Sequence, residues 1–176
     1  MNNCNLTDQA AALLVQSTLS KDKVLKKLDF SGIEMGPKFI EAMKNAFTEN
    51  PNCLEALILT GVKPVVSMGA LSEAIILSKN LTYLDIRANN INAYAVDRFT
   101  KYLVKTEVLE YLNVSQCQLW DKVCEKVIDA LMLNKSVKYL DMSHNRFSSK
   151  DYIIAAKVGR LVQGHPELLH VDISHC

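Results

Sequence analysis

Apolar and polar residues follow a fixed order in the stretch 81–91, which reads LTYLDIRANNI. Apolar residues occupy its first, fourth and sixth places, and an asparagine occupies the ninth (Leu81, Leu84, Ile86, Asn89). The same order returns in 109–119 (LEYLNVSQCQL) and 137–147 (VKYLDMSHNRF). Alternation of this kind is what a short strand with one buried face requires. The constant pitch predicts a repeat protein.

Three further copies extend the pattern in both directions, and repeats then begin at Leu25, Leu54, Leu81, Leu109, Val137 and Leu168. Place nine holds Asn89, Cys117, Asn145 and Cys176, with Ile33 and Val62 as exceptions. An asparagine at the bend can hydrogen-bond backbone groups that are otherwise unpaired, and a cysteine is a weaker substitute. Ile33 and Val62 cannot form these bonds, so we expect the first two turns to be shaped differently.

The second half of each repeat has helical spacing. The residues that carry it are Ile40, Met43 and Phe47; Val96, Phe99 and Leu103; Cys124, Val127, Ile128 and Leu131; and Ile154, Val158 and Leu161. Predicted helix starts are Pro37 at a first helical position, with Asn92, Asp121 and either Ser148 or Ser149 as caps. A strand, a crossover helix and a following strand give parallel strands and a right-handed coil.

The repeat length and the Asn or Cys at place nine resemble the ribonuclease-inhibitor type of leucine-rich repeat, a class that includes Ran GTPase-activating protein and NOD-like receptors. The resemblance implies an α/β fold, a right-handed solenoid with parallel strands on the concave face and helices on the convex face. We expect one domain over 1–176. Its parts are a partial repeat over 1–24 with a helix near Ala10–Leu19, five full repeats over 25–167, and a partial repeat over 168–176.

Composition narrows the function classes. The net charge is +1, from 20 basic and 19 acidic residues, and no basic cluster suggests nucleic-acid binding. Apolar runs are too short for membrane insertion. We therefore expect a cytoplasmic protein, and the resemblance leaves association with the cytoskeleton open as an alternative. The five cysteines form no C-x-x-C pair, which favours reduced thiols and no zinc or redox site. No catalytic motif is present, so we expect neither an enzyme nor a cofactor.

Strand residues at places three, five and seven should project from the concave face. Tyrosine is favoured at protein interfaces, and three tyrosines share place three beside a row of acidic groups. The predicted protein-binding residues are Tyr83, Asp85, Arg87, Tyr111, Asn113, Tyr139, Asp141, His170 and Asp172. Stacking between strands explains the tyrosines equally well. We expect Asp85 and Asp141 to be solvated, with no raised pKa.

Two other groups of side chains remain open to interpretation. His144, His170 and His175 fall on neighbouring concave positions and could bind a metal, but exposed histidines without that role are favoured because no ligand spacing accompanies them. Trp120 is either an exposed anchor or a lid on the core.

The last repeat has no polar cap, although the ends of solenoids need one. We expect a partner or further repeats to cover this open rung. The favoured function is a non-catalytic module that binds a protein through the concave face or the open ends, as part of a larger assembly. The alternative is regulation of an enzyme, as a GTPase activator or an inhibitor.

Overall fold

The computed structural model describes residues 6–19, 25–64, 68–146 and 152–176. Within them one parallel sheet runs in the order β1-β3-β5-β6-β7-β8. Its strands are Lys27–Asp29, Ala56–Ile58, Tyr83–Asp85, Tyr111–Asn113, Tyr139–Asp141 and His170–Asp172. Equivalent places of successive repeats lie side by side, as in the row Tyr83, Tyr111, Tyr139 and His170. The predicted strand positions are therefore confirmed.

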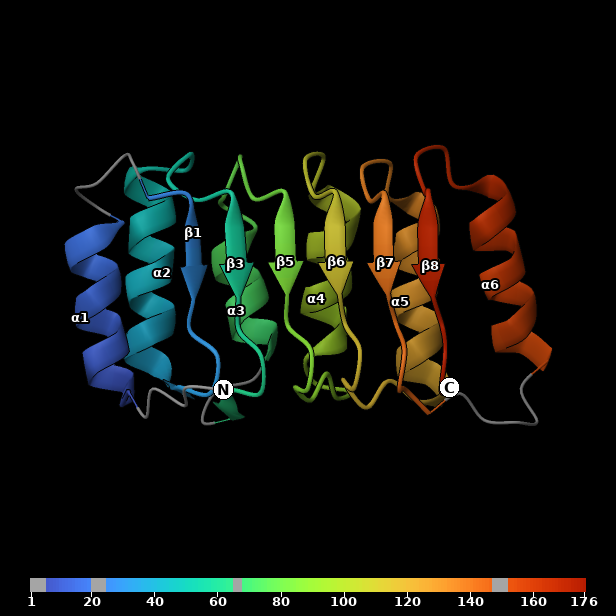
Figure 1. The fold of residues 1–176 in the computed structure, drawn as a ribbon, viewed down its shortest axis with the longest axis horizontal. Helices are drawn as coiled ribbons and strands as arrows, with labels where there is room; N and C mark the ends of the chain where they lie inside the picture. The colour runs from blue at the N-terminus through green and yellow to red at the C-terminus, as the bar shows by residue number, and fades with distance from the viewer. Residues whose placement is uncertain (1–5, 20–24, 65–67, 147–151) are drawn as a thin grey trace.

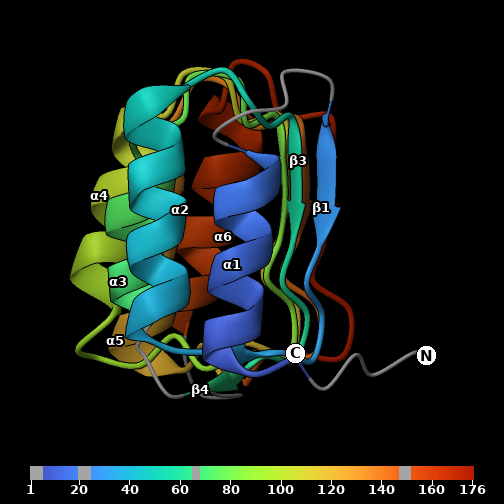
Figure 2. The same ribbon diagram turned by 90° about the vertical axis from the view of Figure 1, so that its left-hand side faces the viewer.

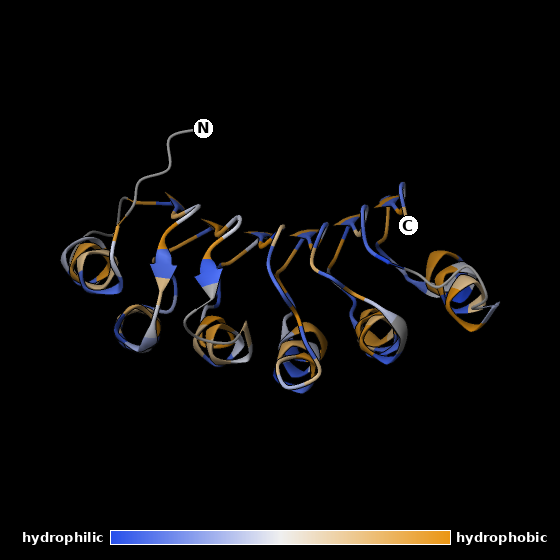
Figure 3. Cartoon of the chain, turned by 90° about the horizontal axis from the view of Figure 1, so that it is seen from below, coloured by the Kyte–Doolittle hydropathy of each residue, from blue (hydrophilic) through white to orange (hydrophobic). Residues whose placement is uncertain are grey.

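Helices form a second layer against one face of the sheet (Figures 1 and 2). They are α1 (Asp8–Thr18), α2 (Pro37–Glu49), α3 (Met68–Ile75), α4 (Val96–Lys105), α5 (Asp121–Leu133) and α6 (Tyr152–Gly164). The layers curve together, with the strands on the inside of the arc and the helices on the outside (Figure 3). A helix is wider than a strand, so stacking both layers in register bends the sheet toward its free face. The predicted α/β solenoid is confirmed.

The core lies between the two layers and is filled by places one, four and six of each repeat. Leu81, Leu84 and Ile86 are at most 1% exposed, and burial of each such side chain is worth about 1.5–3 kcal/mol. The two end repeats differ: Leu25 and Leu28 in the first are only partly buried, as is Val171 in the last, where Ile173 is 43% exposed. Val171 and Ile173 lie on or just after β8, the last strand in the sheet order.

The helix starts agree only in part with the sequence prediction. Pro37 is the first residue of α2, as expected. Asn92 caps a turn ahead of α4, because its Oδ1 accepts hydrogen bonds from the N–H groups of Tyr94 and Ala95. The prediction for Asp121 is wrong: it is the first residue of α5, and the cap is Trp120. Ser148 and Ser149 lie outside the described residues.

The start of α2 also receives a cap from the preceding repeat. The Asp8 carboxylate accepts hydrogen bonds from the N–H groups of Gly36 (2.9 Å), Lys38 (3.2 Å) and Phe39 (2.8 Å). A Cβ on Gly36 would lie 2.4 Å from the Asp8 carboxyl carbon, so only glycine permits this approach. An acidic group at this position also interacts favourably with the helix dipole. Asp8 thereby fixes α1 against α2.

Place eight adopts the left-handed conformation in all six repeats. The residues are Gly32, Gly61, Ala88, Gln116, His144 and His175, with φ between 55° and 74°. Glycine is used in the first two repeats, which are the ones without Asn or Cys at place nine. There the chain continues into a second parallel pair, β2 (Glu34–Met35) with β4 (Lys63–Pro64). The expected difference in shape of the first two turns is confirmed.

Candidate functional site

The place-three column crosses the concave face on neighbouring strands. The rings of Tyr83 and Tyr111 stack with centroids 4.2 Å apart and planes at 2°. Tyr139 follows in register and is 45% exposed, and His170 is exposed beside it. Loss of solvation raises the pKa of Tyr83 to about 12, with Tyr111 adding to the effect. A phenol is protonated at neutral pH with or without this shift, so Tyr83 retains its O–H donor.

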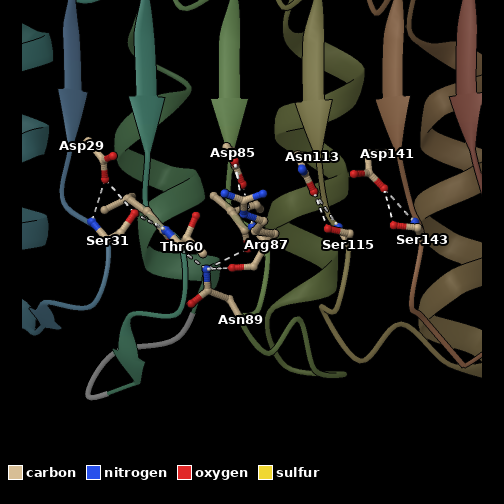
Figure 4. A network of polar contacts seen from close by, with 12 residues as sticks. Asp29, Ser31, Thr60, Asp85, Arg87, Asn89, Asn113, Ser115, Asp141 and Ser143 are labelled. Carbon is tan, nitrogen blue, oxygen red and sulfur yellow. Dashed lines mark hydrogen bonds and ion pairs between the residues drawn. The ribbon is translucent and has the colours of Figure 1, made fainter. Parts of the chain in front are cut away.

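The place-five row supports the backbone, and its central members Asp85 and Asn113 are not exposed (Figure 4). Asp85 and Asn113 are both 3% exposed, which corrects the expectation that they project into solvent. Each turns its side-chain oxygen to the main-chain N–H at place seven. The bonds are Asp85 to Arg87 (3.1 Å), Asn113 to Ser115 (2.9 Å) and Asp141 to Ser143 (2.9 Å). The row satisfies donors that the strand leaves unpaired as it bends.

The serines at place seven strengthen this row. The hydroxyls of Ser31, Ser115 and Ser143 donate to the place-five oxygen of the same strand at 2.6–2.7 Å. Ser115 and Ser143 are buried in doing so. Places five and seven thus form a hydrogen-bonded unit that recurs at β1, β6 and β7 (Figure 4), whereas the second repeat has Ile58 and Thr60 at these places.

Asp85 is a buried carboxylate of the place-five row, and burial disfavours its charged form. Loss of solvation raises its pKa above 3.8, while the Arg87 N–H and guanidinium act in the opposite direction. The Arg87 Nε lies 3.6 Å from Asp85 Oδ2, too far to offset burial fully. The expectation of a solvated Asp85 with no raised pKa is therefore wrong. The reason is that its carboxylate folds back over the backbone instead of facing water.

Replacing Asp85 with asparagine should stabilise the protein at neutral pH. A carboxyl whose folded pKa is raised binds its proton more tightly in the folded state, so stability falls as pH rises from 3.8 through the folded pKa. Asparagine removes this ionisation and keeps the acceptor oxygen, as Asn113 does on the next strand. Melting temperatures of both proteins between pH 3 and 8 measure the effect. The gain should shrink toward acidic pH; a gain that is equal at all pH values contradicts the assignment.

Arg87 is the charged member of a place-seven column otherwise made of serine and threonine. Its side chain is 51% exposed, and the Asp85 carboxylate anchors the guanidinium at one edge. Remaining guanidinium donors face the solvent beside Tyr83 and are available for a carboxylate or a carbonyl group. Arg87 therefore adds a fixed positive charge next to the tyrosine stack.

Place nine is occupied by structural side chains. Asn89 Oδ1 accepts from the Val62 N–H (3.1 Å), and its Nδ2 donates to the carbonyls of Leu59 and Ile86 (both 2.7 Å). Cys117 donates a weaker bond from Sγ to the Ile86 carbonyl (3.2 Å). Asn145 makes the equivalent bonds, so the predicted role of the place-nine asparagines is confirmed. Figure 4 shows Asn89 at the turn below the strand ends.

The three histidines predicted on the concave side, His144, His170 and His175, are exposed. The rings of His144 and His175 stack 4.5 Å apart with planes at 14°. Among the described residues, no group of three His, Cys, Asp or Glu is placed to hold a metal ion. Trp120 is 52% exposed and its backbone bridges to Arg146, so the ring lies at the surface rather than over the core.

The convex face carries features that sequence reasoning missed. Ion pairs connect successive helices: Arg98 with Glu73, Lys126 with Asp97, and Lys157 with Asp129, each at 2.6 Å. A shallow groove of about 450 Å³ separates α4 from α5, and Val104 and Leu133 lie on its walls. The two residues of each pair are separated in the sequence by close to one repeat length. This spacing of opposite charges is a signal that could have predicted the pairs. Such surface pairs contribute little stability individually.

Asn134 is a second missed residue. It is buried after α5, donates to the carbonyl of Leu103 (2.7 Å), and accepts from the N–H of Val137 (2.9 Å). It therefore links one repeat's helix end to the next repeat's strand start. A buried asparagine at a helix C-terminus is a recognisable end signal, since its amide can satisfy free carbonyls.

Comparison with known proteins agrees with this geometry. A family model described as "Leucine Rich repeat" matches residues 133–151, which span the end of α5, β7 and the turn after it. The match and the fold are those of a leucine-rich repeat solenoid and are consistent with the ribonuclease-inhibitor-like type. The matched residues lie mainly in one repeat. The neighbouring strands pair with it in parallel and in register.

Several relatives of this leucine-rich repeat protein are longer. The mouse protein "NACHT, LRR and PYD domains-containing protein 5" is 29% identical over 179 residues, covering 100% of this chain and 15% of its own length. The human "NACHT, LRR and PYD domains-containing protein 14" is 28% identical over 134 residues, covering 74% of this chain and 12% of its own length. The chain thus spans about a seventh of these relatives or less.

Solved structures share the fold at low sequence identity. The tropomodulin C-terminal domain of Caenorhabditis elegans has a TM-score of 0.59 and 15% identity, covering 94% of this chain and 81% of that one. The structure titled "Leiomodin-1 Actin-Binding Site 2 (ABS2)" has a TM-score of 0.60 and 14% identity, covering 89% of this chain and 87% of that one. In the described part of the chain, no helix is both long and apolar enough to cross a membrane.

Proposed function

We propose that this leucine-rich repeat chain is a non-catalytic module that binds another protein through its concave strand face. The observation that supports this most strongly is the place-three column, in which Tyr83 and Tyr111 stack and Tyr139 follows in register. The column is fixed by sheet pairing before any partner arrives. A rigid surface of this kind loses little conformational entropy on binding.

The side chains proposed to touch the partner are those with exposed groups: Tyr83, Arg87, Tyr111, Tyr139 and His170. Asp141 and Asp172 are partly buried and offer only their outer oxygens. Asp85 and Asn113 act from beneath the surface, since their oxygens already accept hydrogen bonds from place seven. The proposed contact surface is therefore aromatic, with one fixed cation at Arg87.

The chemistry of this surface favours a partner that presents planar or cationic side chains to the tyrosines and a carboxylate to Arg87. The length of the relatives supports a role as one part of a larger assembly. Leiomodin-1 is titled as containing an actin-binding site on this fold, which makes actin the first protein to test. In line with this candidate partner, we also propose a cytoplasmic location for the module.

Affinity capture from a native extract tests the proposal. The tagged chain should retain a defined protein partner through washes at low and moderate salt, because the proposed surface is largely aromatic and only partly ionic. Purified filamentous actin in a co-sedimentation assay is a direct probe of the first candidate. Failure to retain any protein at every salt concentration contradicts the proposed function, whereas failure with actin alone excludes only that partner.

A further inference from the structure

A pocket of about 390 Å³ lies between the C-terminal ends of α3 and α4, at the end of the solenoid where the strands begin (Figure 1). Its walls come from two segments: the residues that follow α3, and the last turn of α4 with the loop after it. Helices α2 and α5 pack on either side of this pair, so the pocket lies inside the repeat array. A cavity of this size accommodates a small organic molecule.

The pocket coincides with a change of residue type between two repeats. Thr106 and Asn134 both lie three positions before the first residue of a repeat. Asn134 spans the ends of α4 and α5, because its Nδ2 donates to the carbonyls of Leu103 (2.7 Å) and Thr106 (3.2 Å). Threonine has a shorter side chain, and within the described residues Thr106 forms no comparable bridge to the end of α3. The space that asparagine closes in one repeat therefore stays open in the repeat before it.

Tyr102 brings a buried hydroxyl to this pocket. Its side chain is 2% exposed, and none of the described residues forms a hydrogen bond with its oxygen. Burial raises the pKa of Tyr102, and the neighbouring Thr106 side chain acts in the opposite direction, so the hydroxyl lies beside another residue of the pocket wall. A buried hydroxyl without a partner is destabilising. Because a phenol is protonated at neutral pH, an acceptor oxygen in the pocket can receive its hydrogen bond.

The rest of the lining combines positive charge with apolar surface. Lys79 and Lys105 are exposed at the pocket, and neither forms an ion pair with a described residue. Glu107 is the acidic residue of the lining, which leaves an excess of one positive charge. Ile76 and Val108 are partly buried and supply apolar walls. This composition suits a ligand that has both a negative charge and an apolar body.

From these observations we propose that the pocket is a binding site for a small carboxylate with an apolar body about the size of benzoate. The Tyr102 hydroxyl donates to a carboxylate oxygen, and the two lysines balance the charge. The apolar body packs between Ile76 and Val108. Inorganic phosphate lacks a group for these walls, and a neutral amide leaves the lysines without an anion. The site shares no residue with the concave surface proposed to contact a protein partner.

Nuclear magnetic resonance titration of the ¹⁵N-labelled chain with benzoate, benzamide and inorganic phosphate tests this site. Benzoate should produce saturable shifts of the amide signals of residues 76–79 and 102–108, and the other two compounds should bind at least about ten-fold more weakly. Phosphate or benzamide that binds as tightly as benzoate overturns the assigned chemistry. Absence of saturable shifts in these segments at every benzoate concentration overturns the site itself.

The hydroxyl and the open space have separate variants. Tyr102→Phe keeps the ring and removes an unpaired buried hydroxyl, so its melting temperature should not fall, yet benzoate should bind at least about ten-fold more weakly. Thr106→Asn copies the residue that closes the gap in the next repeat and should weaken benzoate binding to a similar degree. Wild-type affinity in both folded variants overturns the proposal.

A matched pair of lysine variants tests the contribution of charge. Lys79→Gln should weaken benzoate binding about three-fold, as expected for an exposed cation next to an anion. Lys135→Gln removes the same charge from the equivalent exposed position two repeats later, where Asn134 closes the gap, and should leave the affinity unchanged. Equal losses in both variants indicate a general effect of net charge and contradict a defined site.

Discussion

Replacement of Asn145 by alanine should lower the free energy of unfolding by about 3–5 kcal/mol. Asn145 is 2% exposed, and its Oδ1 accepts from the N–H groups of Cys117 and Leu119, both at 3.0 Å. Its Nδ2 donates to the carbonyls of Val114 (2.9 Å) and Met142 (2.8 Å). Alanine leaves these main-chain groups buried without partners in two adjacent repeats. Urea unfolding of both proteins measures the difference.

The chain supplies matched controls for this prediction. Asn145→Cys copies the residue found at the same place in the neighbouring repeat, where Cys117 retains one weak bond to the Ile86 carbonyl. Its loss of stability should be smaller than that of the alanine variant. Asn90→Ala changes an exposed asparagine next to place nine and should shift stability by less than about 0.5 kcal/mol. An alanine variant at position 145 as stable as the Asn90 variant contradicts the structural role.

The sequence predicts the strands and most helices because their positions depend on which residues can be buried. Leu84 and Leu112 alternate with polar neighbours, and that alternation is enough to orient each strand. Asn89 is predictable because a buried amide at a bend has few alternatives to bonding the backbone. These are local properties that repeat along the chain.

The features that the sequence did not predict depend on contacts between repeats or on local geometry at the bend. The alternating strand pattern predicts an outward side chain for Asp85. In the structure, the bend brings the Arg87 N–H within 3.1 Å of its carboxylate. Asp8 caps α2 although it lies 28 positions before Gly36, and no local sequence pattern near Gly36 predicts the contact. The cap of α5 is Trp120, whose side chain makes no capping bond, so residue type offered no signal. The residues proposed to bind a partner remain a prediction.

Loss of two tyrosines from the concave face should remove most of the binding energy of the partner. Tyr111→Ala with Tyr139→Ala removes half of the Tyr83–Tyr111 stack and the exposed ring that follows it. Aromatic residues of this kind at interface centres contribute about 2–4 kcal/mol, which corresponds to a loss of affinity of roughly 30-fold to 1,000-fold. Stability should change much less, because neither ring is part of the core.

Isothermal titration calorimetry tests the concave-face proposal most directly, by measuring the affinity of the captured partner for three proteins. The proteins are the wild-type chain, Tyr111→Ala with Tyr139→Ala, and a control, Tyr94→Ala with Leu133→Ala. The control removes one exposed ring and one exposed aliphatic side chain outside the concave face, which are 85% and 65% exposed. The proposal predicts that only the tyrosine pair on the strands weakens binding. Unchanged affinity in that variant, or loss confined to the control, contradicts it and moves the site to the helices.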